Sequence, residues 1–199
     1  MSSSAAVHKT SHSLIFVGII LLLSGTGLLL TIFFPVLTQE VTYQLRSIST
    51  PPQLTPVDTQ IGIDIPKIGA NAKIIANVDP YNSQEYQLQL TRGVAHAQGT
   101  AFPGQIGNVF LFAHSSDNWY AANRYNSVFY LIHQLEKGDA IDLYYQDHKY
   151  SYHVVDKKTV DPQSVTYLQN STSQKQVTLM TCWPPGTTLS RLLVIAQVD

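Results

Sequence analysis

Cysteine is almost absent from this sequence, and charge is sparse. Cys182 is the only cysteine in 199 residues, which excludes an intrachain disulfide framework and any metal site built from several cysteines. Charged residues make up 13% of the chain and the net charge is −1, so the basic surface of a nucleic-acid-binding protein is missing. Disulfide scaffolds, multi-cysteine metal proteins and nucleic-acid-binding proteins are therefore set aside.

One long uncharged stretch lies near the N-terminus. Residues 14–34 are predominantly apolar, and a transmembrane helix needs ~20 such residues. A cleaved signal peptide is the alternative, but its apolar core usually has only ~7–15 residues, and no small-x-small cleavage site follows the run here. We predict one transmembrane signal anchor over residues 14–37, after a polar tail over residues 1–13.

The rest of the chain divides into a linker and one domain. Residues 38–60 are polar and contain three prolines, which is typical of a semi-extended linker. Residues 61–199 are long enough to form a single domain with a proper core. Eleven tyrosines and many β-branched residues shift the composition of the chain toward β structure.

Short strand-like runs recur through residues 61–199. They are the segments 61–65, 72–76, 108–113, 140–145, 150–155, 177–180 and 191–196. Residues 78–106 contain many turn signals, so we expect them to cross the surface, and residues 128–135 are compatible with a short helix. Many short strands with little helix predict an all-β fold, either a barrel or a sandwich.

Cys182 lies where a strand gives way to a loop. The prolines that follow Trp183 cannot donate ladder hydrogen bonds, so the chain must leave the sheet there, and Arg191 begins the next predicted strand. A thiolate is a nucleophile, and a nearby cation favours it. A free cysteine is also often a small buried hydrophobe. The local pattern alone leaves both interpretations open.

Two further residues stand at strand ends and can complete a reactive site. His114 follows the apolar run 108–113, and an imidazole can act as a base toward a thiol and then protonate a leaving amine. Arg191 can donate hydrogen bonds to an oxyanion, and Thr181 can add a donor beside Cys182. Alternatively, His114 only caps its strand and Arg191 is a surface charge. His96 has no strand signal around it and is predicted to be structural.

These residues lie within motifs that resemble those of the sortase family. The sequence TLMTC at 178–182 is similar to the family's TLxTC motif, and RLLV at 191–194 resembles its next strand. Residues 99–114 resemble the block GTAxPGxxGNxxxxxH, while 63–68 and 135–139 resemble the opening strand and the LKxGD turn. The likeness covers residues 61–199 with the motifs in the family's order.

The resemblance implies a closed eight-stranded β-barrel with short helices and a thiol transpeptidase. By matching positions, Cys182 is the nucleophile, His114 the acid and base, and Arg191 the stabiliser of substrate or oxyanion. The family cleaves an LPxTG-like sorting signal between Thr and Gly and passes the acyl group to an amine on a peptidoglycan cross-bridge or a pilin lysine. The barrel is then extracytoplasmic, on a single-pass membrane protein with a cytoplasmic N-terminus.

The sequence differs from the pilin-polymerising class C sortases. Their lid carries an Asp-Pro-aromatic motif before the barrel, whereas here residues 79–81 follow the first strands. The insertion at 116–125 resembles class D or E. We assign no metal site and no cofactor, because the acidic loop residues that bind calcium in some sortases have no alignable counterpart.

Two rival functions remain at this stage. The first is another cell-wall cysteine hydrolase, but papain-like and amidase domains place Cys before His, and residues 181–183 do not fit the L,D-transpeptidase signature. The second is a membrane-tethered β-barrel that only binds a partner, with Cys182 inert.

Overall fold

The computed structural model describes residues 12, 14–28, 55–115, 128–168 and 172–198. The chain divides into two compact units, residues 1–45 and 46–199. In the first unit residues 14–28 are helical, and residues 29–37 of the predicted anchor lie outside the described residues. No helix in the described part of the chain is both long and apolar enough to cross a membrane.

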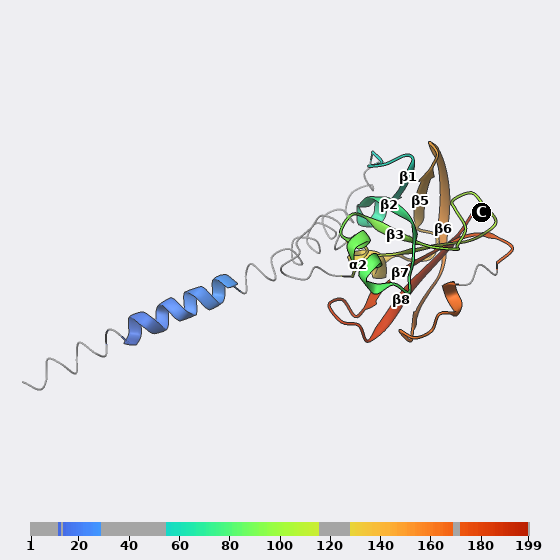
Figure 1. Cartoon of the computed structure of the whole chain (residues 1–199). Coiled ribbons are helices and arrows are strands. Elements are labelled where there is room, and N and C mark those ends of the chain that lie inside the picture. Colours follow the sequence, from blue (N-terminus) through green and yellow to red (C-terminus); the bar gives the residue numbers. More distant parts are fainter. Residues whose placement is uncertain (1–11, 13, 29–54, 116–127, 169–171, 199) are drawn as a thin grey trace, which may run out of the picture. The chain divides into compact units, whose positions relative to one another are not determined.

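Eight strands of the second unit close into a barrel (Figure 1). They are β1 (Ile61–Ile65), β2 (Ala70–Val78), β3 (Val94–Ala97), β4 (Gly107–Phe112), β5 (Ala140–Tyr145), β6 (His148–Val160), β7 (Lys175–Trp183) and β8 (Ser190–Gln197). Their order around the barrel is β1-β2-β3-β4-β7-β8-β6-β5. The β2–β3 and β4–β7 pairs are parallel and the other neighbouring pairs are antiparallel. The predicted eight-stranded barrel is confirmed.

The neighbouring strands β4 and β7 contribute many buried residues to the core. All six residues of β4 are buried, which explains why its sequence is a continuous apolar run rather than an alternating one. Val177 and Leu179 of β7 are fully buried beside it. Both strands therefore hold their C-terminal ends, and the residues that follow, in fixed positions.

Residues 78–106 contain two elements that the sequence did not predict. The helix α2 (Ser83–Leu90) packs against β2 and β3, and the Asn82 side chain caps it by accepting from Glu85 N at 3.2 Å. Of its residues only Leu90 is buried, so the helix shows almost no apolar periodicity. The expectation that this segment merely crosses the surface is wrong, because α2 and the four-residue β3 lie within it.

Other predicted elements are found close to their expected positions. The 3-10 helix η2 (Tyr130–Gln134) lies within the predicted helical segment. The predicted hairpin is formed by β5 and β6, and its turn residues Gln146 and Asp147 have φ angles of 51° and 63°. Such positive φ values at both central residues match the right-handed twist of a two-residue hairpin. Tyr152 of this hairpin is fully buried.

His96 is structural, as predicted, although it belongs to β3. Its exposed fraction is 1%. Its Nε2 lies 3.0 Å from both Ala101 O and the Thr100 hydroxyl, and its Nδ1 accepts from Asn77 N at 3.3 Å. Burial lowers the pKa of His96, which keeps the ring neutral near pH 7.

The last part of the predicted linker is bonded to the barrel. Asn71 of β2 holds it with both side-chain groups: Oδ1 accepts from Val57 N at 2.9 Å, and Nδ2 donates to Thr55 O at 2.6 Å. Farther along, the Thr59 hydroxyl and Gln60 Nε2 donate to the Asp147 carboxylate, each at 2.6 Å. Residues 55–60 therefore form a strap across β2 and the β5–β6 turn.

Beside this strap, a pair of carboxylates is buried between β1 and β5. Asp64 and Asp142 are register partners and are 3% and 6% exposed. Asp142 forms an ion pair with Lys149 Nζ at 2.7 Å and accepts from the Ser151 hydroxyl at 2.7 Å. Asp64 Oδ1 has no hydrogen-bond partner among the described residues. Burial, and secondarily the charge of Asp142, raises the pKa of Asp64 to about 6.

Candidate active site

Three neighbouring strands bring the predicted reactive residues to one end of the barrel. His114 lies two residues beyond β4, whose last residue pairs with Met180 of β7. Cys182 of β7 is the register partner of Arg191 at the start of β8. Strand β7 pairs with β4 in parallel and with β8 in antiparallel orientation. Cys182 on β7 therefore lies between the segment that carries His114 and the strand that carries Arg191.

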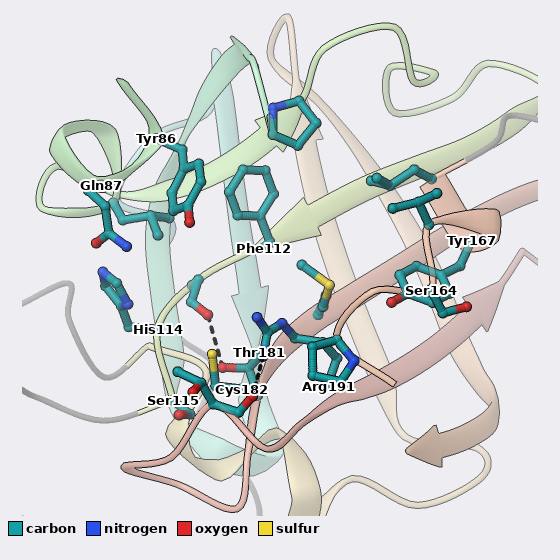
Figure 2. A pocket seen from close by; sticks show the side chains of 18 of the residues that line it. Tyr86, Gln87, Phe112, His114, Ser115, Ser164, Tyr167, Thr181, Cys182 and Arg191 are labelled. Carbon is teal, nitrogen blue, oxygen red and sulfur yellow. Dashed lines mark hydrogen bonds between the residues drawn. The ribbon is translucent and has the colours of Figure 1, made fainter. Parts of the chain in front are cut away.

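The three side chains border the same cavity. Its volume is about 470 Å³, and His114, Cys182 and Arg191 all line it. In Figure 2 the Cys182 sulfur lies between the His114 ring on one side and the Arg191 side chain on the other. Cys182 is a free thiol and half-buried, so it is held by its strand yet reachable from the cavity.

His114 is also half-buried, and this sets its protonation state. Burial lowers the pKa of His114 below the ordinary value of 6.5, because a charged imidazolium is poorly solvated there. At neutral pH the ring is therefore mainly neutral. A neutral imidazole can accept a proton from a thiol, which a protonated one cannot do.

Arg191 is held by the loop that joins β7 to β8. Its Nη1 donates to Thr188 O at 3.3 Å and to Ser190 O at 3.2 Å. Within the described residues these are its only hydrogen bonds, so the Nη2 and Nε groups remain for a ligand in the cavity. Burial raises the pKa of the Tyr167 phenol, and the nearby positive charge of Arg191 offsets part of that rise.

Thr181, predicted to offer a backbone or hydroxyl donor beside Cys182, uses its hydroxyl within the protein. It is 3% exposed, and its hydroxyl donates to Ala113 O at 2.9 Å. The hydroxyl hydrogen is therefore already used within the protein, in a bond that ties β7 to the residue before His114.

Residues 63–199 match the family model of the sortase domain. The chain belongs to the sortase family. A curated relative, Sortase D of Bacillus subtilis (strain 168), is 26% identical over 122 residues, which cover 61% of this chain and 53% of the relative. The chain thus spans about half the length of that relative. The class D-like resemblance of the sequence is consistent with this match.

Solved structures of sortases share the fold. Sortase A from Corynebacterium diphtheriae is 28% identical with a TM-score of 0.59, and the match covers 71% of this chain and 61% of that one. Sortase D5 from Clostridium perfringens, named as a transpeptidase, has a TM-score of 0.58 at 23% identity, covering 80% and 88%. At that identity the second likeness supports the fold alone.

Aromatic side chains line two sides of the cavity of this sortase, and they were not predicted from the sequence. On one side Tyr86 of α2 meets Phe112 edge to face, with ring centroids 6.0 Å apart. On the other side Tyr167, from the 3-10 helix η3 (Thr166–Leu168), stacks on Phe110 with centroids 6.1 Å apart. The polar sequence around Tyr86 concealed α2, so no signal in the sequence placed this tyrosine at the site.

Trp183, the residue after Cys182, is held through both its ring and its backbone. Its ring lies 5.2 Å from that of His133 in η2, and its carbonyl accepts from the Ser190 hydroxyl at 2.8 Å.

No group of three or more His, Cys, Asp or Glu side chains suited to a metal ion occurs among the described residues. The cavity presents the thiol of Cys182, the imidazole of His114 and the guanidinium of Arg191.

Proposed function

We propose that this sortase is a membrane-anchored cysteine transpeptidase acting on secreted proteins with an LPxTG-like sorting signal. The observation that carries the proposal is the position of the chain's single thiol, on the cavity wall opposite Arg191 and beside a neutral His114. The rival binding module offers no reason for these three groups to share one cavity.

The first half-reaction transfers the acyl group of the substrate to sulfur. His114 takes the thiol proton, and Cys182 Sγ adds to the carbonyl carbon of the Thr–Gly bond. Arg191 donates hydrogen bonds to the resulting oxyanion. The C–N bond then breaks, His114 returns the proton to the leaving amine, and a thioester remains on Cys182.

The second half-reaction transfers the acyl group to an amine. The amine nitrogen adds to the thioester carbonyl and His114 accepts its proton. The C–S bond then breaks to release a new amide, and His114 returns the proton to sulfur, which restores the thiol. The acceptors implied by family membership are a peptidoglycan cross-bridge or a pilin lysine. Attack by water at the same step would instead give hydrolysis.

The test uses an LPxTG-type peptide with and without an oligoglycine amine. We expect an amide adduct with the amine, and mass spectrometry should find the acyl group on Cys182. Cys182→Ala should abolish both products, because the chain contains no other thiol. Products with no amine adduct would make the protein a hydrolase, and full activity of Cys182→Ala would remove the proposal.

Membrane anchoring by residues 14–37 is the second part of the proposal. The apolar run over 14–34 supports it, because its length suits a bilayer better than a signal-peptide core. It would hold the barrel on the extracytoplasmic side with the N-terminus in the cytoplasm. The intact mass of the membrane-extracted protein should include this run, and a mature chain that begins after residue 34 would contradict the anchor.

A further inference from the structure

At the end of the ladder between β4 and β7, a side-chain hydrogen bond stands where a backbone bond would be expected. The two strands are parallel and stay in register to Phe112 and Met180, and the last backbone bond runs from Ala113 N to Met180 O at 3.2 Å. In a regular parallel ladder the next bond would join Cys182 N–H to Ala113 O. Ala113 O instead accepts from the Thr181 hydroxyl at 2.9 Å.

This exchange leaves the amide of the nucleophile without its ladder partner. Among the described residues no hydrogen bond joins Cys182 N to Ala113 O. The carbonyl of Met180 points toward β4, so the N–H of Cys182, two residues later, points to the same side. There β4 has ended, and Ala113 and His114 line the cavity.

We propose that Thr181 is a positioning residue whose hydroxyl replaces the last ladder bond and so reserves the Cys182 N–H for the oxyanion. The proposal rests on the acyl transfer proposed above. When sulfur adds to the carbonyl carbon, the oxygen becomes negative until the C–N bond breaks. The nucleophile's own amide is a known type of oxyanion donor. Arg191, the register partner of Cys182 on β8, approaches from the opposite strand as a second donor.

The same bond also holds the loop of His114 in place. Ala113 is gripped at both ends of its peptide unit, by Met180 O through its N–H and by the Thr181 hydroxyl through its carbonyl. His114 is the next residue and has lost regular strand pairing. A single buried hydroxyl thus fixes both the base and the free amide relative to Cys182.

The first test does not depend on activity. Because Cys182 is the only cysteine, the full chain labelled with 15N-cysteine gives one amide resonance. In Thr181→Val, Ala113 O loses its hydroxyl partner, so Cys182 N–H should bond to it and exchange with solvent at least about tenfold more slowly. An amide already protected in the wild type, or exchange unchanged by the substitution, would overturn the proposal.

The second test separates a positioning effect from general damage. Losing an oxyanion donor typically costs ~10²–10³-fold in kcat, so Thr181→Val should lower kcat by about 10²-fold with little change in KM. Thr181→Ser, which keeps the hydroxyl, should recover most of that loss. A large KM effect with kcat retained, or no recovery by serine, would contradict the assigned role.

Thr178→Val is the matched control on the same strand. Thr178 is also buried, at 1% exposure, and its hydroxyl donates to Asn108 Oδ1 at 2.9 Å, away from the cavity. It should leave kcat and the Cys182 amide unchanged, and an equal loss of kcat would show that packing of β7 is responsible. If the wild type transfers no acyl group to any amine, the transpeptidase proposal fails. The rate of solvent exchange of the Cys182 amide still tests whether the Thr181 hydroxyl has replaced the last ladder bond.

Discussion

Two parts of the barrel hold buried or half-buried ionisable groups, and only one of the two borders the cavity. At the end of β4, β7 and β8, His114 and Cys182 are half-buried and border a cavity. Between β1 and β5, Asp64 and Asp142 are more deeply buried and do not line that cavity. The pKa of Asp64 is raised to about 6, yet its side chain is almost fully enclosed by the protein. A perturbed pKa therefore marks a reactive site only where a ligand can approach.

The comparison predicts its largest effect at His114. His114→Ala should lower kcat/KM by ~10²–10⁴-fold, because the acid and base steps are lost. In the wild type the rate should fall as pH decreases through the lowered pKa of His114, since a protonated ring cannot accept the thiol proton. The acidic midpoint of kcat/KM should therefore lie below 6.5, and a midpoint above 6.5 would contradict it.

Asp64 should affect stability, and with the opposite dependence on pH. Its folded pKa of about 6 exceeds the ordinary 3.8, so the folded state binds the proton more strongly and stability falls as pH rises from 3.8 through 6. Asp64→Asn cannot ionise and should raise the free energy of unfolding on the order of 2 kcal/mol at pH 8, with little change at pH 4. Urea unfolding at both pH values measures this.

The matched control for Asp64 is an exposed carboxylate. Asp156 lies 3.9 Å from Lys158 with both side chains about half exposed, so Asp156→Asn should change stability by less than ~0.5 kcal/mol at either pH. Asp64→Asn should also leave the acidic limb of kcat/KM in place. Loss of that limb would show that the two regions are coupled.

The smallest effect is expected at the strap formed by residues 55–60. Asn71→Ala removes the two hydrogen bonds to Thr55 and Val57 and should cost about 1–2 kcal/mol of unfolding free energy, without changing kcat/KM. Gln163→Ala, at an exposed position, is the control and should be neutral. A loss of activity in Asn71→Ala at full occupancy of the folded state would contradict the separation of strap and site.

The sequence predicted the reactive end of the barrel well and its sides poorly. Strand β4 is buried throughout, and β7 and β8 are buried in their middle parts, so their apolar runs were visible in the sequence. His114, Cys182 and Arg191 lie close to where those runs begin or end. Helix α2 was missed because it buries only Leu90. Its fold is set by the Asn82 cap and by packing on β2 and β3, which periodicity does not reveal.

Hydrogen bonds between residues far apart in the sequence were also not predictable from the sequence. Residues 55–60 look like a linker because they are polar, and their partners Asn71 and Asp147 lie 14 or more residues away. The role of Thr181 has the same origin, since its hydroxyl meets Ala113 O across 68 residues of sequence. A hydrogen-bond donor can be recognised from the local sequence, but its acceptor is known only from the tertiary structure.

The strap has a mechanical consequence for a protein pulled from its N-terminal side. Tension arriving at residue 55 passes first to Asn71 of β2 and then to Asp147 in the β5–β6 turn, before it loads the backbone of β1. In the barrel order β1 is separated from β7 by three strands and from β8 by two. Tension applied at residue 55 is therefore carried first by strands that hold neither Cys182 nor Arg191.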